Sequence, residues 1–378
     1  MQIKVGILGA TGEVGQRFVL NLQRHPWFKI AALYASEKSA GKTYREALSY
    51  GKEDSRWFCR EKPLEEVLEM EVKSMEKIDA GECSHFFSAL PSEVALEVEG
   101  RVAREKPVVS TASAYRYFDD SFTYLPGVNE DHVQMIEVQR RNRGWRGFVV
   151  PQPNCTTIGL ALSLKPIYEK FGLRSVVMAS MQSVSGAGYA AVAEWAKQRK
   201  AQGSELPYPL ENYSLKMFEG NVIPYIKDEE MKVKRETVKL LGKMVGERIE
   251  PARFLITCKC NRVPVLYGHT ESVFIQTEKK CTLVELKEAW RNYMGLPQKL
   301  GLPTAPKHPI VVMEEVDRPQ PRFDSNIENG MVAVIGGVEE TPFENGFQYT
   351  VLSHNIELGA ARGAVLAAEY LYKAGLIS

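Results

Sequence analysis

Short apolar runs alternate with helical patterns through the first part of the chain. Each run is followed by a turn and then by a stretch in which apolar residues recur at helical spacing. This alternation is typical of βαβ units, so it predicts a parallel sheet with helices on its faces. The expected strands are Ile3–Leu8, Ile30–Tyr34, His85–Ser88 and Pro107–Ser110, and the expected helices include Val14–Arg24 and Ser92–Arg104.

From about Ser175 the pattern changes to longer runs in which apolar and polar residues alternate. Alternation of this kind is typical of strands with one buried face. It predicts an α+β domain, in which helices pack on one face of a mostly antiparallel sheet. The expected strands lie within Val176–Val184, Arg253–Ile275, Ile310–Val316 and Met331–Glu339, and the expected helices are Met231–Met244 and Thr282–Tyr293.

A chain of 378 residues is long enough for two domains. The prediction is an α/β fold with a first domain at residues 1–153 and a second at residues 154–354. The tail, Asn355–Ala374, has the pattern of an amphipathic helix rich in small residues, and we expect residues 355–378 to return to the first domain. A polar stretch, Trp195–Tyr213, is expected to begin as a helix and to end in a proline-containing loop.

Composition narrows the functional classes. The formal net charge is +1 and no long run has one sign, so nucleic-acid binding and membrane-surface binding gain no support. Neither a signal peptide nor an apolar stretch long enough to span a membrane is visible, so a cytoplasmic protein is expected. The six cysteines are scattered, and Cys258-Lys259-Cys260 lacks the spacing of a zinc knuckle. We therefore expect reduced thiols and no metal site.

The turn after the first expected strand is rich in glycine. Its sequence, Gly9-Ala10-Thr11-Gly12-Glu13-Val14-Gly15, joins a strand to a helix. Glycines at such a turn let backbone N–H groups approach a pyrophosphate, which the helix N-terminus also favours. This context predicts a Rossmann dinucleotide-binding domain. The alternative is a glycine turn in an α/β protein that binds no nucleotide.

The tip of the second expected strand indicates which dinucleotide binds. NAD sites commonly place an acidic residue there to bind the ribose 2′-hydroxyl. Here Ser36 lies at the tip, with Ser39, Lys38 and Lys42 close by in sequence, and this set suits a 2′-phosphate. Glu37, in contrast, is an acidic residue of the kind that favours NAD. The balance favours NADP over NAD.

Cys155 is the candidate nucleophile. It precedes a helical pattern that begins at Thr156, and a helix N-terminus favours a thiolate. A nucleotide site together with a nucleophilic cysteine suggests a dehydrogenase that works through a thioester, which needs an acid/base group. Arg262 and His269 lie together in an interrupted strand, and arginine suits a carboxylate. The alternatives are a buried, inert Cys155 and a structural His269.

A series of ordered motifs extends over nearly the whole chain. Together they closely resemble the aspartate-semialdehyde dehydrogenases of archaea and fungi. After the glycine turn come Ser88-Ala89-Leu90-Pro91, Ser113-Ala114-Tyr115-Arg116, Pro153-Asn154-Cys155-Thr156-Thr157, Gln182-Ser183-Val184-Ser185-Gly186-Ala187-Gly188-Tyr189, Asn221-Val222-Ile223-Pro224-Tyr225-Ile226, Arg262-Val263-Pro264-Val265, Gly268-His269-Thr270-Glu271, Ala305-Pro306-Lys307-His308-Pro309 and Asp317-Arg318-Pro319-Gln320-Pro321-Arg322.

The resemblance implies a role for each matching residue. Cys155 would carry the acyl group, His269 would act as general acid/base, and Gln182 would orient the acyl group. The second domain would be the catalytic and dimerisation domain. The substrate would be held by Arg262 at its carboxylate, Glu229 at its amine, Arg116 and Lys232 at its phosphate, and Asn154. NADP would be held by Gly9, Thr11, Gly12, Glu13, Val14, Ser36, Ser39, Ser88, Leu90, Ser185, Gly186 and Asn355.

The implied reaction is the NADPH-dependent reduction of aspartyl 4-phosphate to aspartate 4-semialdehyde, and its phosphate-dependent reverse. It belongs to the biosynthesis of lysine, threonine and methionine. A homodimer or homotetramer is expected. Taken alone, the segment with Glu229 and Lys232 would be a solvated helix start, and Arg116 would lie in a surface loop. We also expect Cys155 to be alkylated faster than the other cysteines near neutral pH.

Three departures from the family pattern stand out. About thirty residues follow Tyr189 before the Asn221 motif, Gly337 lies where an arginine commonly ends the strand, and Glu357 lies where a basic residue is usual. Related archaeal enzymes of this fold reduce malonyl-CoA or succinyl-CoA, and that activity is the alternative. They need no carboxylate for an amine, so Glu229 favours aspartate semialdehyde. A non-catalytic nucleotide-binding partner subunit is the remaining alternative.

Overall fold

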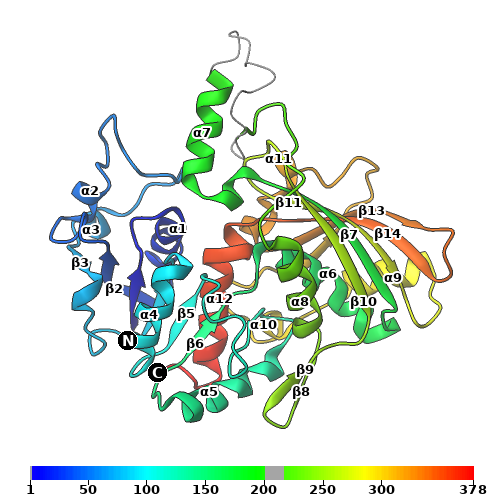
Figure 1. Ribbon diagram of the computed structural model, residues 1–378, viewed down its shortest axis with the longest axis horizontal. Coiled ribbons are helices and arrows are strands. Elements are labelled where there is room, and N and C mark those ends of the chain that lie inside the picture. The colour runs from blue at the N-terminus through cyan, green and yellow to red at the C-terminus, as the bar shows by residue number, and fades with distance from the viewer. Residues whose placement is uncertain (1, 201–216) are drawn as a thin grey trace.

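The computed structural model describes residues 2–200 and 217–378, which form two sheets that lie side by side (Figure 1). The first sheet is parallel throughout, with the strand order β3-β2-β1-β4-β5-β6. It confirms the predicted βαβ organisation. Its strands are β1 (Ile3–Leu8), β2 (Phe28–Ala35), β3 (Val72–Ser74), β4 (His85–Ser88), β5 (Val108–Ser110) and β6 (Val149–Pro151).

Helices follow these strands as the periodicity predicts. The helix after the glycine turn, α1, spans Glu13–Leu22, and α4 spans Ser92–Ala103. The sequence did not predict β3 and β6, each of which has only three residues. The other helices of this part are α2 (Tyr44–Ala47), α3 (Glu65–Leu68) and α5 (Met135–Arg143).

The second sheet is mixed, with the order β10-β7-β11-β14-β13-β12. Strands β10 and β7 are parallel, as are β12 and β13, and the three central pairings are antiparallel. The prediction of a mostly antiparallel sheet is therefore confirmed, although β14 was not predicted. The strands are β7 (Ser175–Gln182), β10 (Leu255–Arg262), β11 (His269–Gln276), β12 (Ile310–Val312), β13 (Ala333–Glu340) and β14 (Gly346–Ser353).

One face of the second sheet is covered by helices and the other is open. Helices α6 (Cys155–Phe171), α8 (Glu229–Leu240) and α9 (Leu283–Arg291) share a core with this sheet, in which the fully buried Trp290 donates its indole N–H to the Ser163 carbonyl at 2.7 Å. On the open face Val177, Leu255 and Phe274 are 47%, 76% and 39% exposed. An apolar sheet face this exposed indicates a surface that another protein covers.

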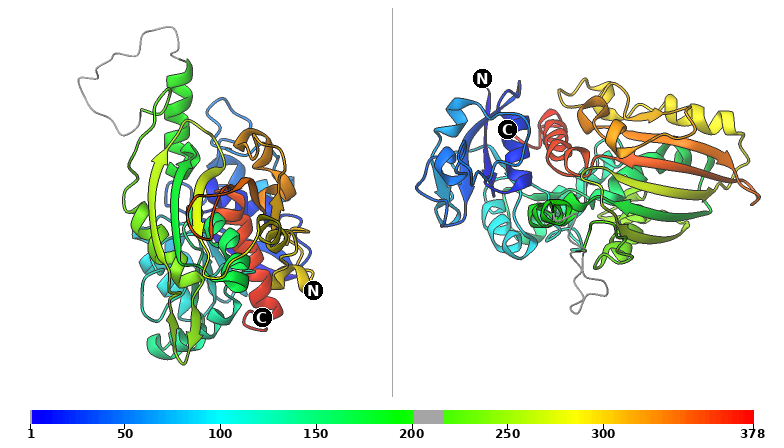
Figure 2. Two further views of the ribbon diagram at one scale, coloured as in Figure 1. Left: turned by 90° about the vertical axis from the view of Figure 1, so that its right-hand side faces the viewer. Right: turned by 90° about the horizontal axis from the view of Figure 1, so that it is seen from above.

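The C-terminal segment returns to the first sheet, as predicted. A π-helical turn, η5 (Glu357–Ala361), leads into α12 (Arg362–Lys373). Figures 1 and 2 show α12 in the seam between the two sheets. Residues Val365, Ala368 and Leu371 are buried in the core of the first sheet. Helices η5 and α12 thus tie the two parts together, and the division at residue 153 stays a prediction.

Helix α7 (Tyr189–Lys200) projects from the body of the molecule (Figure 2). It confirms the predicted helical start of the polar stretch at Trp195, whereas the predicted loop up to Tyr213 falls largely outside the described residues. None of the described helices is long and apolar enough to cross a membrane. Within residues 2–200 and 217–378, no group of three or more histidine, cysteine or acidic side chains is arranged to hold a metal ion.

Candidate active site

A pocket of about 430 Å³ opens at the carboxyl ends of β1, β4 and β5, where parallel sheets commonly bind ligands. The N-terminal ends of α1 and α6 meet there. The segments at residues 185–189 and 355–360 close it from the second sheet. Of the predicted site residues, the pocket wall contains Gly12, Glu13, Val14, Arg116, Asn154, Cys155, Ser185, Gly186 and Asn355.

Cys155 is the first residue of α6, as the sequence predicted. Asn154 caps this helix, because its side-chain Oδ1 accepts the N–H groups of Thr156 at 3.0 Å and Thr157 at 3.2 Å. The thiol is partly exposed at the pocket wall. Gly359 of η5 passes so close that a Cβ there would lie 3.0 Å from the Cys155 Cβ. Only a residue without a side chain fits comfortably at that point.

The electrostatics of Cys155 correct the expectation of an acidic thiol. Burial raises the pKa of Cys155 to about 12, and the Glu229 carboxylate adds to this rise. Arg262, Arg116 and the N–H of Thr156 lower the pKa, but they do not outweigh burial. Without bound ligands the thiol is therefore protonated at neutral pH.

Another cysteine is the more acidic one in the free protein. A hydrogen bond with Cys260 lowers the pKa of the partly exposed Cys258, whereas burial raises the pKa of Cys59 and Cys83 to about 12. The expectation that Cys155 is alkylated fastest near neutral pH stays a prediction. The sequence could not reveal the direction of these pKa shifts, because they depend on burial and on charges from distant segments.

His269 faces Cys155, with its Nε2 3.3 Å from the sulfur. The backbone N–H of Ser183 donates to its Nδ1 at 3.2 Å. Burial lowers the pKa of His269 well below its usual value, and the charge of Arg262 acts in the same direction. Because a neutral imidazole carries one proton and Nδ1 accepts a hydrogen bond, we infer that the proton lies on Nε2, toward the sulfur.

Arg262 and Gln182 are brought together by strand register. They are paired on β10 and β7, and His269 begins the next strand, β11, at the same end of the sheet. The NH1 group of Arg262 donates to the Ser183 carbonyl at 2.7 Å. Gln182 is buried, and its amide nitrogen donates to the Ser180 hydroxyl at 3.2 Å.

Gly186 lies between the pocket and these groups. A Cβ at Gly186 would come within 2.7 Å of the Arg262 NH1 and 3.1 Å of the His269 Cε1. The glycine therefore allows the backbone to approach the arginine and the imidazole closely. Arg262 and His269 thus lie directly behind the wall that Gly186 forms.

Glu229 opens α8 and is buried beside the start of α6. Its Oε1 accepts the Asn154 side-chain amide at 2.9 Å and the Thr156 hydroxyl at 3.1 Å. Lys232, one turn later, places its Nζ 3.8 Å from the Glu229 Oε2. The carboxylate is therefore held in place, and neither residue belongs to a fully solvated helix start.

Glu236 is a site residue that the sequence reasoning missed. It is buried on the same face of α8, seven residues after Glu229. Its carboxylate accepts the Asn154 backbone N–H at 2.6 Å and the Tyr117 hydroxyl at 2.6 Å, and it lies 3.5 Å from the Arg116 NH1. The signal in the sequence is the helical spacing of these two acidic residues.

Arg116 is buried at the pocket wall rather than in a surface loop. Its NH2 donates to the Thr111 carbonyl at 3.2 Å, and its Nε is buried without a hydrogen-bond partner among the described residues. Glu236 balances part of its charge. A buried guanidinium with an unused donor beside a pocket suits an anionic ligand.

The glycine turn has the geometry of a nucleotide cradle. Gly9 has φ +81°, and a Cβ there would lie 2.9 Å from the Ala89 carbonyl oxygen. A Cβ on Gly15 would lie 2.1 Å from the Gly9 carbonyl oxygen, whereas at Gly12 the nearest atom would be 3.5 Å away. Close packing thus requires glycine at the two outer positions, and the middle position opens toward the pocket.

The tip of β2 leaves Ser36 exposed and buries Ser39, whose N–H donates to the Ser36 carbonyl at 2.8 Å. The Glu37 carboxylate accepts a hydrogen bond from the Ser74 hydroxyl at the end of β3, so one of its oxygens already has a partner within the protein.

Three other predicted cofactor residues, Thr11, Ser88 and Leu90, are not among the residues that line the pocket. Ser88 and Leu90 are buried, and Ala89 between them forms the pocket wall. Thr11 lies in the glycine turn, where its carbonyl accepts the Gln16 side-chain amide at 3.0 Å. Any contact of Ser88 or Thr11 with a ligand would therefore be made through the backbone around them.

Asn355 organises the wall opposite α1. Its Oδ1 accepts the Gly268 N–H at 3.0 Å and the Ser183 hydroxyl at 3.1 Å, and its Nδ2 donates to the Ser185 hydroxyl at 2.9 Å. The side chain thus fixes the segment that holds His269 in place. The tail of the chain therefore helps to build the site.

Comparison with known protein families identifies the family to which this chain belongs. A family model described as semialdehyde dehydrogenase, NAD binding domain, matches residues 4–136, and one described as semialdehyde dehydrogenase, dimerisation domain, matches residues 164–357. An aspartate-semialdehyde dehydrogenase of Archaeoglobus fulgidus is 43% identical over 380 residues, which covers all of both chains. This chain belongs to the aspartate-semialdehyde dehydrogenase family.

Other members agree over the full length. The aspartate-semialdehyde dehydrogenase of Methanothermobacter thermautotrophicus is 40% identical, covering 98% of this chain and 99% of the relative. A crystal structure of the Candida albicans enzyme with NADP matches with a TM-score of 0.81 at 32% identity, over 98% of this chain and 99% of that one. A Vibrio cholerae enzyme II complexed with ASA matches with a TM-score of 0.77 at 25% identity, over 99% of both chains.

Two departures from the family pattern lie outside the pocket wall. Gly337, with φ +58°, is part of an irregularity in the pairing of β13 with β14. Glu357 is buried between cations, with its Oε1 3.2 Å from Arg17 and its Oε2 3.5 Å from Arg362. Its charge is therefore neutralised inside the protein rather than presented to a substrate.

The pocket also contains an aromatic pair that the sequence did not predict. The rings of Phe58 and Tyr189 stack with their centroids 3.5 Å apart and an interplanar angle of 25°. Phe58 belongs to the first part of the chain and Tyr189 starts α7, so the pair joins the two walls of the pocket. It requires a contact between segments far apart in sequence, which no local pattern indicates.

Proposed function

We propose that this chain is an NADP-dependent aspartate-semialdehyde dehydrogenase that reduces L-aspartyl 4-phosphate to L-aspartate 4-semialdehyde through a Cys155 thioester. The observation that carries the proposal is the placement of the Cys155 sulfur 3.3 Å from the His269 Nε2, with the charges of Arg262 and Glu229 close enough to act on the thiol. The family relationship supports the same reaction. Residues 1–153 and 355–378 would bind NADP, and residues 154–354 would carry the chemistry.

The substrate would be held by groups of opposite charge. Arg262 has further N–H groups to bind the α-carboxylate, Glu229 would bind the α-ammonium group, and Arg116 with Lys232 would bind the phosphate. Asn154 joins these groups, because its side chain contacts Glu229 and its backbone contacts Glu236. The carbonyl carbon would then lie over the thiol of Cys155.

Substrate binding would also activate the thiol. Glu229 raises the pKa of Cys155, so an ammonium group paired with Glu229 would cancel this effect and favour the thiolate. The sulfur would form a bond to the acyl carbon as the bond from that carbon to the phosphate oxygen breaks, and the departing phosphate would take up the thiol proton. Arg116 and Lys232 would stabilise the departing phosphate.

His269 would act on the second half of the reaction. Bound NADPH supplies the hydride to the thioester carbon. The Nε2–H of His269 would donate a hydrogen bond to the oxyanion of the resulting hemithioacetal and stabilise its charge. The carbon–sulfur bond would break as this oxygen becomes the aldehyde carbonyl, and the thiolate released at Cys155 would take up a proton from solvent. Gln182, beside Arg262, would help to orient the acyl group, because its side-chain amide nitrogen has a second N–H group that can donate to the carbonyl oxygen.

The cofactor assignment rests on the fit of the first domain. The outer glycines allow the tight turn and the close packing of the helix on the strand, and Gly12 between them leaves the backbone open to a pyrophosphate. Exposed Ser36 at the tip of β2 favours a 2′-phosphate. The related enzyme from Candida albicans was solved with NADP, which supports NADP as the cofactor here.

We further propose a homodimer or homotetramer in the cytoplasm that serves lysine, threonine and methionine synthesis. The open face of β10, β7 and β11 would be the dimer surface, because Val177, Leu255 and Phe274 are exposed there. The family model that matches this part is a dimerisation domain, which supports the proposal.

A substrate panel tests the function. Purified protein should oxidise aspartate semialdehyde with NADP only when phosphate is added, and NAD should support a much lower kcat/KM. Reduction of malonyl-CoA or succinyl-CoA without phosphate-dependent activity would instead identify an acyl-CoA reductase. Binding of NADP with no turnover of any of these substrates would indicate a non-catalytic partner subunit.

A further inference from the structure

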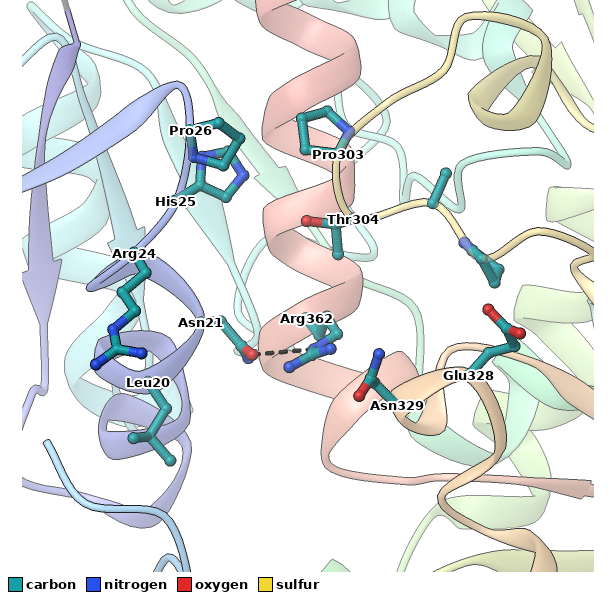
Figure 3. A pocket seen from close by; sticks show the side chains of 12 residues that line it. Leu20, Asn21, Arg24, His25, Pro26, Pro303, Thr304, Glu328, Asn329 and Arg362 are labelled. Carbon is teal, nitrogen blue, oxygen red and sulfur yellow. Dashed lines mark hydrogen bonds between the residues drawn. The ribbon is translucent and has the colours of Figure 1, made fainter.

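A second pocket lies on the other side of α1 from the catalytic pocket. Its volume is about 260 Å³, and the two pockets have no lining residue in common. Figure 3 shows it between the end of α1, the loop at residues 303–306 and the turn at residues 328–329. A pocket slightly smaller than the usual range of about 300–1,000 Å³ suits a small metabolite rather than a dinucleotide.

Two arginines line this pocket from different helices, Arg24 at the end of α1 and Arg362 on α12 beside Asn329 (Figure 3). Arg24 is exposed and has no hydrogen bond or ion pair to any described residue. Arg362 uses its Nε for the Asn21 Oδ1 at 2.9 Å and for Glu357 at 3.5 Å. Its two terminal nitrogens form no hydrogen bond within the described part of the chain. These unused donors suit a carboxylate, which accepts several hydrogen bonds from guanidinium groups.

An acidic group lies across the pocket from Arg24. Figure 3 shows Glu328 and Asn329 across the pocket from Arg24 and the end of α1. Glu328, Asn329 and Gly330 have φ values of +48°, +57° and +74°, a left-handed stretch that costs energy at the two non-glycine residues. Among the described residues, the Glu328 carboxylate accepts one hydrogen bond, from the Lys307 N–H at 3.4 Å, so it has capacity for an ammonium group.

The pocket has a rigid frame that keeps these groups apart. The His25 Nδ1 accepts the N–H groups of Trp27 and Phe28 at 3.2 and 3.0 Å, so its Nε2 carries the proton that it shares with Glu369 at 2.7 Å. Glu369 also accepts hydrogen bonds from the N–H and hydroxyl of Thr304. This buried network joins α1, α12 and the loop at residues 303–306.

The geometry points to a binding site for a free α-amino acid, with its carboxylate at Arg24 and Arg362 and its ammonium group at Glu328. The two charges of this ligand class match the two kinds of charged group in the pocket. Leu20, Pro26 and Pro303 would contact an apolar side chain. The site is independent of the proposed function, because none of its residues lines the catalytic pocket.

Glu357 connects the two pockets. It accepts the Asn21 side-chain amide at 3.3 Å and pairs with Arg362, and it begins η5, whose Gly359 packs on Cys155. Because the Glu357 carboxylate lies 3.5 Å from the Arg362 Nε, it holds Arg362 at the second pocket. A ligand that draws Arg362 away from Glu357 would therefore alter the support of the catalytic thiol.

The test is a binding measurement on the NADP-saturated protein. The twenty common L-amino acids are screened singly by thermal shift, and those that raise the Tm are titrated by calorimetry. At least one should bind once per chain with a Kd of about 1 mM or lower. Its N-acetyl derivative and its amide, which each lack one charge, should bind at least about tenfold more weakly.

Variants then locate the site. Arg24→Gln and Glu328→Gln change exposed side chains and should keep the fold, yet each should weaken binding about tenfold or more. Arg146→Gln, a matched exposed arginine outside both pockets, should bind normally. Arg262→Gln should also leave this binding unchanged, because Arg262 belongs to the catalytic pocket. Absence of any binding, or binding that only Arg262→Gln abolishes, would overturn the proposal.

Discussion

The two ends of the catalytic pocket are built in different ways. The nucleotide end depends on one short segment, Gly9–Gly15, in which backbone atoms pack so closely that a Cβ on Gly15 would lie 2.1 Å from the Gly9 carbonyl oxygen. The thiol end depends on residues far apart in the sequence. Cys155 starts α6, Glu229 starts α8 and His269 starts β11, and hydrogen bonds join them through Asn154, Ser183, Glu236 and Asn355.

This difference predicts two kinds of sensitivity. The nucleotide end should fail through steric collision at single backbone positions, with little effect on the thiol. The thiol end should fail either at the reacting group itself or, more gradually, through the residues that position it. Each prediction below separates cofactor binding from thiol chemistry, and the expected effects decrease in size.

The largest effect should come from the nucleophile. Cys155→Ser should lower kcat by at least about 10⁴-fold, because no other described thiol lies beside His269 in the pocket. NADP binding, measured by fluorescence titration, should change less than about twofold, since the glycine turn is untouched. Cys258→Ser is the matched control and should keep normal turnover. Substantial activity in Cys155→Ser would refute the thioester mechanism.

The converse variant is Gly15→Ala. Its added methyl group would collide with the Gly9 carbonyl oxygen, and NADP affinity should fall about a hundredfold. Gly81→Ala is the control outside the pocket, because an added Cβ there would meet only the Asp79 side chain, and it should bind NADP normally. Iodoacetamide labelling of Cys155 should be equal in both. Equal loss of NADP binding in both variants would show that backbone packing is not the deciding factor.

A smaller loss is expected at Glu236, the positioning residue that joins Arg116 to Asn154. Glu236→Gln keeps the shape but removes the charge that faces Arg116, and kcat/KM should fall about thirtyfold. The loss should appear mainly in the KM for phosphate in the oxidative direction. Lys234→Gln, on the exposed side of α8, should be silent. An unchanged KM for phosphate would contradict the proposed positioning role of Glu236.

The smallest expected effect has the opposite sign. The Glu229 carboxylate raises the pKa of Cys155, so Glu229→Gln should lower that pKa and increase the thiolate fraction at any pH below it. Iodoacetamide labelling of Cys155 at pH 8 should therefore become faster, by up to about tenfold for one pKa unit. Peptide mass spectrometry should follow Cys155 separately from Cys258. Slower labelling of Cys155 in the variant would contradict the proposed substrate activation.

The sequence predicted the nucleotide end of the pocket better than the thiol end. The glycine turn and the helix start at Cys155 are local patterns, and the structure has both where they were expected. Strand β14 was missed, although Phe347, Tyr349 and Val351 alternate with polar residues and are buried. That alternation is a signal of strand structure that the prediction could have used.

The thiol end required information that lies outside local patterns. Glu236, the Phe58–Tyr189 stack and the contact of Gly359 with Cys155 all arise when distant segments pack together. The pKa of Cys155 was predicted with the wrong direction, because the helix N-terminus is visible in the sequence but burial and the charge of Glu229 are not. The sequence allowed catalytic roles to be assigned to residues such as Cys155, whereas the protonation states of these residues depend on the fold.

The central claim is that Cys155 carries the acyl group, and trapping that group tests it most directly. The protein is mixed with NADP and aspartate semialdehyde without phosphate, quenched in acid, and analysed by intact-mass and peptide mass spectrometry. The account predicts one aspartyl group per chain, on the Cys155 peptide alone, formed with one equivalent of NADPH and discharged when phosphate is added. NADPH formation without an adduct, or an adduct on another cysteine, would contradict it.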